Sequence, residues 1–357
     1  MQSGSTQHLV MDNIVYSLQR AGGGSVYWSN LQSRLMDDST LDVEIIERMD
    51  AVNNIIRAKQ GHACPTNGTN HDLPLRIDEI RKVPVSGKCL FHSSDYRFGV
   101  GEGCINITTV HDFICEKYYS GITKHFSIWQ ISRAVRHSQG LICVSESTKR
   151  DLLKYIPSAA LTPTTVIYHG FDSTYTYRSV ARLKQVAFIG SRGSSYKNFQ
   201  IAVDSVALVP DLELVIIGSP LTHEEEMMLQ ARIPGRYKSV VFPSSSEICG
   251  LFNESVALLY LSEYEGFGLP VLEAMASGLP VIALNTSSIP EVGGNAAKLL
   301  DEPAPEEIAC IIKDLMDNDA GFELTVKEGL AQAALFSWDR TARETRMFYD
   351  EMWKTHE

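Results

Sequence analysis

The sequence predicts an α/β protein built from two doubly wound domains. Short apolar runs alternate with helical stretches in both halves of the chain, which is the pattern of parallel sheets covered by helices. The runs are apolar at consecutive positions, as expected of strands that are buried on both faces. At 357 residues the chain is long enough for two domains of ordinary size.

Predicted strands and helices alternate through the first half. The strands are expected at Leu9–Tyr16, Val43–Ile46, Cys89–His92, Ile105–Val110 and Leu141–Val144. The helices are expected at about residues 25–37, 126–138 and 147–156. Between about residues 50 and 85 the chain is rich in Gly, Asn, His and Pro, which predicts a long loop with at most a short helix.

The second half repeats this alternation. Its strands are expected at Val186–Gly190, Leu214–Gly218, Ser239–Phe242, Ala257–Leu261, Pro280–Leu284 and Ala296–Leu300. Helices are expected between these strands and at about residues 304–316, 321–334 and 338–354. A polar stretch without a clear period at about 171–185 is the predicted linker. We therefore expect an N-terminal domain over residues 1–175 and a C-terminal domain over residues 176–337.

Charge and composition exclude several classes of partner. The formal net charge of −11 argues against broad nucleic-acid binding, which requires a basic surface. It also argues against strong binding to anionic membranes through a polybasic surface, although the net charge of the whole chain does not reveal a local basic patch. No apolar stretch approaches the roughly 20 residues that span a bilayer. The seven cysteines are scattered, which favours free buried thiols. We expect a cytoplasmic protein with at most peripheral contact on the inner face of the membrane.

The most informative segment is Ser262–Ile282. A buried strand leads into a glycine-containing loop, a short helix and another strand, and ligands bind at the carboxyl ends of strands in such units. Pro270 suits the first turn of this helix and Gly278 suits its C′ position. Glu265 lies in the loop and Glu273 on the helix, with seven residues between them. Two such carboxylates can accept hydrogen bonds from a polyhydroxylated ligand on two sides. The alternative is a surface loop and a packing helix, with both glutamates solvated.

This segment resembles the nucleotide-sugar signature of the retaining GT-B glycosyltransferases of family four, and the resemblance covers nearly the whole chain. It implies two Rossmann-like domains that face a cleft, with a last helix at 338–357 that crosses back to the N-terminal domain. It also implies that Glu265 contacts the donor hexose and Glu273 the nucleotide ribose. The neighbouring positions expected at the donor are Gly266, Phe267, Gly268 and Leu269.

A second glycine-containing turn, Gly190–Asn198, follows the first strand of the C-terminal half. A turn that ends at a helix N-terminus is a natural anion site, and the alternative is a solvated basic turn. In the family that the chain resembles, an Arg and a Lys here neutralise the donor diphosphate, which places Gly190, Arg192 and Lys197 at the donor. The single Asp-x-Asp, Asp317–Asp319, is expected to be a solvated helix end, so we predict no metal and no cofactor.

In the N-terminal half, His111 and Asp112 follow a predicted strand. The family has a His-Asp pair at such a strand end, with the His facing the donor sugar; the alternative is a structural His bonded to Asp112 or to backbone. Gly23 and Gly24 follow the first strand, and the family uses this loop beneath the donor diphosphate or the acceptor, which implies donor contact for both glycines. A tight turn explains them equally well. One further segment resembles mannosyl- and rhamnosyltransferases and is expected on the acceptor side: Ser93, Ser94, Tyr96 and Arg97.

These expectations describe a retaining glycosyltransferase that moves a hexose, with mannose favoured, to a saccharide or a lipid-linked saccharide in surface polysaccharide synthesis. The donor would be GDP-mannose or a UDP-hexose. His111, Glu265, Arg192 and Lys197 are the residues expected to act in transfer. The alternative is a catalytically silent GT-B scaffold or partner subunit, which would be expected to lose such residues. A nucleotide-sugar epimerase on the same fold is disfavoured by the helix motif.

Overall fold

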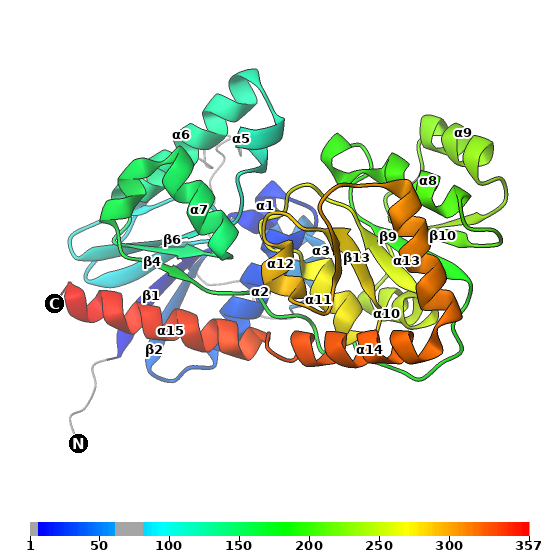
Figure 1. The fold of residues 1–357 in the computed structure, drawn as a ribbon. Coiled ribbons are helices and arrows are strands. Elements are labelled where there is room, and N and C mark those ends of the chain that lie inside the picture. The colour runs from blue at the N-terminus through cyan, green and yellow to red at the C-terminus, as the bar shows by residue number, and fades with distance from the viewer. Residues whose placement is uncertain (1–5, 61–80, 357) are drawn as a thin grey trace. The chain divides into compact units, whose positions relative to one another are not determined.

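The computed structural model describes residues 6–60 and 81–356 (Figure 1). The chain forms two compact units, and unit 1 combines the chain up to His169 with the segment from Trp338 onward. Unit 2 is Gly170–Ser337. The chain therefore passes from unit 1 to unit 2 after His169, before the expected domain boundary at residue 175. His169 still belongs to unit 1, where its ring stacks on Tyr27 with 4.7 Å between the centroids.

Unit 1 is built on a six-stranded parallel sheet. In spatial order its strands are β2 (Leu41–Ile46), β1 (Gln7–Asp12), β4 (Cys89–Ser93), β6 (Cys104–Val110), β7 (Gly140–Cys143) and β8 (Thr164–Val166). A two-stranded sheet pairs β3 (Val83–Pro84) with β5 (Gly99–Val100). The helices are α1 (Val15–Leu18), α2 (Gly23–Met36), α3 (Ile55–Lys59), α5 (Ile114–Tyr118), α6 (Gly121–His137), α7 (Glu146–Tyr155) and α15 (Trp338–Thr355), with 3-10 turns at Met49–Asn53 and Pro157–Leu161.

Unit 2 is also built on a six-stranded parallel sheet. In spatial order its strands are β11 (Tyr237–Val241), β10 (Glu213–Gly218), β9 (Gln185–Ile189), β12 (Ala257–Tyr260), β13 (Val281–Leu284) and β14 (Lys298–Leu300). The helices are α8 (Phe199–Ala207), α9 (His223–Arg232), α10 (Ser245–Glu254), α11 (Leu269–Ala276), α12 (Ile289–Gly293), α13 (Pro305–Asp317) and α14 (Asp319–Ala333), with a 3-10 turn at Ser195–Lys197.

The sheet of unit 2 has the strand order of a Rossmann fold. From β9 the chain runs outward through β10 to β11, and it then returns to place β12 on the other side of β9. The connections that leave β9 and β12 therefore diverge, and the two strand ends form a topological switch point where ligands of such sheets bind. In unit 1 the corresponding reversal lies between β1 and β4.

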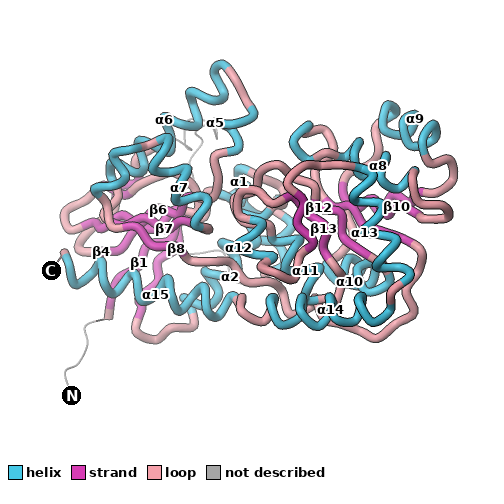
Figure 2. Tube along the Cα trace, viewed as in Figure 1, coloured by secondary structure: helices cyan, strands magenta, loops and turns pink. Residues whose placement is uncertain are grey.

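Burial on both faces explains the continuous apolar runs. Along β10, Leu214 and Ile216 join a core cluster with residues of α8, α13 and α14. Val215 and Ile217, which alternate with them and face the other side of the sheet, are equally buried. A strand covered on both faces has no solvent side on which to place polar residues. Figure 2 shows the resulting arrangement, with each sheet lying among helices.

The predicted strands are confirmed, and most of their ends differ by one or two residues. The predicted end of the first strand, Tyr16, is wrong. The first strand stops at Asp12, whereas Val15 and Tyr16 belong to α1 and are buried there. An apolar run does not by itself separate a strand from a short buried helix. The prediction of buried thiols also needs correction, because Cys310 is exposed; the described cysteines are unpaired, and Cys64 lies outside the described residues.

Among the described residues, no helix combines the length and the apolar character needed to cross a membrane.

Candidate active site

Lys197 and Glu265 meet at the switch point of unit 2. Lys197 ends the loop that leaves β9, and Glu265 lies in the loop that leaves β12. The Lys197 ammonium donates a hydrogen bond to Oε1 of Glu265, and each side chain is 12% exposed. The two charges predicted from separate motifs are therefore paired with each other in this structure.

Two tyrosines hold this ion pair in place. The Lys197 ammonium lies 5.2 Å from the ring centre of Tyr196 and 5.7 Å from that of Tyr260, within the range of a cation–π contact. Burial, together with the neighbouring Glu265 carboxylate, raises the pKa of the Tyr260 phenol well above its usual value. Tyr260 therefore stays protonated and is hydrogen-bonded to Glu265, which orients the carboxylate.

Serines after β13 fix the backbone of the Glu265 loop. The Glu265 N–H donates to Oγ of Ser287 at 3.0 Å. The Ser288 hydroxyl lies 3.1 Å from the Glu265 carbonyl and 2.8 Å from that of Phe267. These serines were not among the predicted site residues, although polar residues that follow an apolar strand are a sequence signal for a site at the strand end.

Glycines define both ends of α11. Gly268 precedes the helix with φ 104°, and a Cβ there would lie 2.9 Å from Cδ1 of Ile289, so a side chain would be strained. At the other end Gly278 has φ 72°, and the Leu279 N–H donates to the Ala274 carbonyl at 2.9 Å. Gly278 thus occupies the C′ position of a Schellman motif, which confirms the predicted helix end.

The remaining positions of the signature surround the start of α11. Gly266 is half-buried, Phe267 is buried with its ring centre 6.1 Å from that of Phe336, and Leu269 is the first residue of the helix. The N-cap residue is Gly268, and no side chain within the described part of the chain caps this N-terminus. The positive end of the α11 dipole is therefore oriented toward the loop that carries Glu265.

Glu273 lies on α11 and is half-buried. Burial raises the pKa of its carboxyl to about 7, and a hydrogen bond with the Tyr175 hydroxyl opposes this shift. Tyr175 is buried, although it lies in the predicted linker, and it was not among the predicted site residues. Near pH 7 the Glu273 carboxyl is consequently balanced between its neutral and ionised forms.

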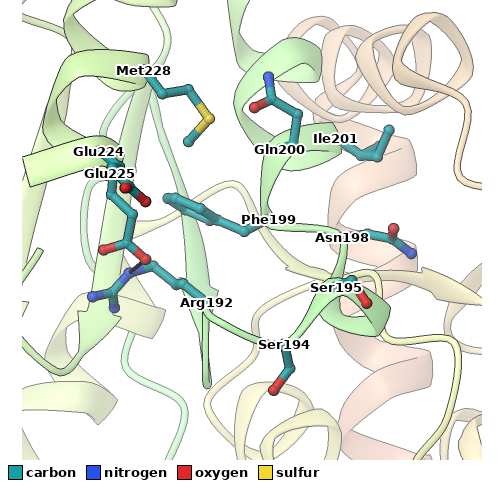
Figure 3. A pocket seen from close by; sticks show the side chains of 10 residues that line it. All are labelled: Arg192, Ser194, Ser195, Asn198, Phe199, Gln200, Ile201, Glu224, Glu225 and Met228. Atoms are coloured by element: carbon teal, nitrogen blue, oxygen red, sulfur yellow. Dashed lines mark hydrogen bonds and ion pairs between the residues drawn. The ribbon is translucent and has the colours of Figure 1, made fainter. Parts of the chain in front are cut away.

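Arg192 is engaged away from Lys197. Its Nε donates to Oε1 of Glu225 at 3.0 Å (Figure 3). Its Nη2 donates to the carbonyls of Ser219 at 2.9 Å and Pro220 at 2.8 Å. The side chain is 2% exposed. Its Nη1 is buried without a hydrogen-bond partner among the described residues.

A pocket of about 430 Å³ opens beside Arg192, where α8 and α9 begin (Figure 3). Its apolar lining residues are Phe199, Ile201 and Met228, and Glu225 pairs with Arg192 at its edge. The other lining residues are Ser194, Ser195, Asn198 and Gln200. Gly190, with φ 133°, lies in the same loop as Arg192.

In unit 1, His111 directly follows β6. Its ring meets the Tyr27 ring edge-on with 5.1 Å between centroids, and its carbonyl accepts a hydrogen bond from the Thr148 hydroxyl at 3.3 Å. The Tyr96 hydroxyl is bonded to the His111 backbone N–H. Burial lowers the pKa of His111 to about 4, so the imidazole is neutral near pH 7. The Asp112 carboxylate accepts a hydrogen bond from the Ile114 N–H at 2.9 Å, at the start of α5.

The predicted acceptor-side residues are mostly buried around Asp12. Arg97 forms an ion pair with both carboxylate oxygens of Asp12, and the Ser93 hydroxyl donates to Oδ2 at 2.7 Å. The Ser94 hydroxyl donates to the Asp12 carbonyl at 2.7 Å. In this structure these three side chains bind Asp12 and contribute to the packing of β1 against β4, and their acceptor role stays a prediction. Of the four predicted residues, Tyr96 is the least buried.

Gly23 and Gly24 form the first turn of α2, and Gly22 precedes the helix. A Cβ on Gly24 would lie 2.9 Å from Nε2 of Gln19, the end of a flexible side chain that can move aside. Gly23 is exposed.

The Asp-x-Asp sequence serves local structure. The Asn318 side chain accepts the Gly321 N–H at 2.9 Å, which caps α14, and Asp319 pairs with Arg182 at 2.5 Å. Within residues 6–60 and 81–356, no group of three or more His, Cys, Asp or Glu side chains is arranged to hold a metal ion.

Comparison with known sequences identifies the C-terminal unit. Residues 178–329 match the family model described as glycosyl transferases group 1. The chain is also 33% identical over 95 residues to an O-antigen chain mannosyltransferase B of Escherichia coli. That match covers 27% of this chain and 25% of the relative, so it spans about a quarter of the relative's length.

Solved structures match nearly the whole fold. HepE of Anabaena, in complex with UDP and glucose, has a TM-score of 0.74 and 16% identity, and the match covers 97% of this chain and 100% of HepE. Sucrose-phosphate synthase of Thermosynechococcus elongatus has a TM-score of 0.72 and 16% identity, with 98% and 100% covered. WaaG, a glycosyltransferase of lipopolysaccharide biosynthesis, has a TM-score of 0.67 and 11% identity, with 94% and 98% covered. Residues 178–329, most of unit 2, therefore match the glycosyl transferases group 1 model, and the two Rossmann-like domains give the chain the GT-B fold.

Proposed function

We propose that this protein is a retaining glycosyltransferase that transfers a hexose from a nucleoside diphosphate sugar to a saccharide or lipid-linked saccharide. The observation that carries the proposal is the Lys197–Glu265 pair at the switch point of unit 2. A cation and a carboxylate at one strand-end site match the two halves of such a donor, an anionic diphosphate and a hydroxyl-rich sugar.

The roles follow from the chemistry of each side chain. Lys197, with the uncapped N-terminus of α11, would stabilise the negative charge that develops on the departing diphosphate. Glu265 would accept hydrogen bonds from hexose hydroxyls, and Glu273 from the ribose diol. His111 would contact the donor sugar as a neutral imidazole, a role that rests on the resemblance of the His111–Asp112 pair to the family motif.

We propose mannose as the transferred hexose and GDP-mannose as the donor, supported by the partial match to a mannosyltransferase. A UDP-hexose is the competing donor, because HepE was solved with UDP and glucose. A thermal-shift panel of GDP-mannose, UDP-glucose and their nucleotides separates the two. A ligand at a hundred times its dissociation constant stabilises by about 2.7 kcal/mol, which such a panel detects. A shift with UDP-glucose and none with GDP-mannose would exclude the mannose assignment.

Transfer itself is tested with Glu265→Gln and the matched variant Glu263→Gln, which changes an exposed glutamate in the same loop. Loss of transfer in Glu265→Gln alone supports the proposed sugar contact. Equal activities in both variants and in the wild-type protein would contradict it.

We further propose that the diphosphate is neutralised by side chains and the α11 N-terminus and needs no metal. Transfer should then survive EDTA, and loss of activity that magnesium or manganese restores would refute this part of the proposal.

A catalytically silent scaffold is a second candidate, because the Arg192 guanidinium is held by Glu225 and two carbonyls. The discriminating measurement is turnover of the donor, either by transfer or by slow hydrolysis. A protein that binds the donor but never cleaves it would be the scaffold.

A further inference from the structure

The outer side of α6 has an unusual composition for a surface helix. Ile122 is 88% exposed, Trp129 is 42% exposed, and Phe126 between them is also exposed. The inner side of the same helix is already packed, since Ile131, Ala134 and Val135 are buried there. A surface helix normally has a polar outer side, whereas the outer side of α6 carries large apolar side chains as well.

Basic residues share this outer side. Residues three or four apart lie on one face of a helix, and this spacing aligns a set that we call the α6 face: Ile122, His125, Phe126, Trp129, Arg133 and Arg136. The Arg133 guanidinium lies 5.2 Å from the ring centre of Trp129, and Arg136 is exposed.

The surrounding sequence contains no opposing charge. From Lys117 to Ser145 the chain has neither Asp nor Glu, although the whole protein carries 43 acidic residues and a net charge of −11. Within an acidic protein, this segment is therefore a local region that an anionic surface would attract. Tyr118 and Tyr119, directly before α6, are exposed as well.

We propose that the α6 face docks on an anionic lipid bilayer, with its aromatic and aliphatic side chains in the interface and its arginines among the headgroups. Interfacial helices combine an apolar side with basic residues, and tryptophan and tyrosine favour the headgroup level. An acidic protein would match the arginines, but it would not require a large aliphatic side chain as exposed as Ile122. This inference goes beyond the proposed transfer reaction and does not depend on it.

Vesicle sedimentation of the intact protein tests the proposal without donor or acceptor. Binding should be strong to vesicles of phosphatidylglycerol and phosphatidylcholine, weak to phosphatidylcholine alone, and reduced by salt. Arg136→Ala should weaken binding about fivefold, from the contribution of one basic residue near an anionic surface. Ile122→Ser should weaken it about tenfold, and its exposure makes a folding defect unexpected. The matched controls Arg343→Ala and Met347→Ser change exposed residues on α15 and should leave binding unchanged.

Tryptophan fluorescence locates the contact. The protein has four tryptophans, and Trp28, Trp338 and Trp353 are buried, so Trp129 is the one placed to enter lipid. Brominated phosphatidylglycerol should quench it, and Trp129→Phe should lose the quenching while it still sediments with vesicles. The proposal is overturned by absence of sedimentation, by equal losses in the control variants, or by quenching that persists in Trp129→Phe.

Discussion

The pKa of Glu273 leads to a quantitative prediction for nucleotide binding. Burial raises this pKa from 4.5 to about 7 in the ligand-free protein. If both ribose hydroxyls donate to the carboxylate, binding requires the ionised form. The ionised fraction falls from about nine-tenths at pH 8 to about one-tenth at pH 6, so nucleoside diphosphate affinity should fall about tenfold over this range.

Calorimetry of GDP and UDP at pH 6, 7 and 8 measures this effect. The diphosphate also takes up protons in this range, and Glu273→Gln isolates that contribution because its side chain does not titrate. The wild-type protein should show the steeper pH dependence, and Glu263→Gln should behave like the wild type. Identical pH dependence in the wild type and in Glu273→Gln would refute the assignment of Glu273 to the ribose.

The raised pKa of Glu273 also determines whether its contribution to protein stability rises or falls with pH. Because its pKa is higher in the folded state, Glu273 binds more protons there than in the unfolded chain between pH 4.5 and about 7. Its contribution to the free energy of unfolding therefore falls as pH rises through this window and is lowest above pH 7. Glu273→Gln should raise the stability at pH 8 relative to pH 4.5 by up to about 3 kcal/mol in urea unfolding. A stability difference that does not change with pH would contradict the raised pKa.

Three further predictions concern residues that support the site. Gly268→Ala forces a side chain into a left-handed conformation and should cost about 1–3 kcal/mol in urea unfolding, whereas Gly193→Ala, with open space around it, should cost less than about 1 kcal/mol. Tyr175→Phe removes a hydrogen bond to Glu273, so the pH midpoint of nucleotide binding should move upward; an unmoved midpoint would argue against that bond. Arg97→Ala leaves the buried Asp12 carboxylate without its ion-pair partner and should destabilise by about 3–5 kcal/mol, and a smaller loss would show that water reaches it.

The central part of the site could be predicted because it follows from local sequence and sheet topology. Each motif directly follows an apolar strand, and β9 and β12 are neighbours in the sheet. Loops that follow neighbouring parallel strands lie at the same edge, so Lys197 and Glu265 come together although they are far apart in sequence. The helix between Glu265 and Gly278 was predictable from its proline and glycine positions alone.

The partners of these residues could not be predicted, because nothing in their own segments marks them. Tyr175 lies in an irregular polar stretch, and its hydroxyl reaches Glu273 through tertiary folding. Glu225 belongs to an acidic first turn of α9, where a solvated helix start is the ordinary expectation, yet it binds Arg192. Ser93 and Arg97 were expected at the acceptor because their segment follows a strand and resembles mannosyl- and rhamnosyltransferases. The acidic residue that buries them, Asp12, is on a different strand.

The Lys197–Glu265 pair predicts that the intact donor and the free nucleotide place different demands on the site. A diphosphate that takes Lys197 leaves a largely buried Glu265 without its cation, and hexose hydroxyls compensate for this loss only when the sugar is present. Glu265→Gln removes the competing charge, so it should bind free nucleoside diphosphate about tenfold more tightly than the wild type, a gain of about 1.4 kcal/mol. The same variant should lose its preference for the intact donor over the nucleotide. Calorimetry with both ligands tests this, with Glu263→Gln as the control. If Glu265→Gln instead weakens nucleotide binding, the ion pair assists the diphosphate contact and the competition argued here does not exist.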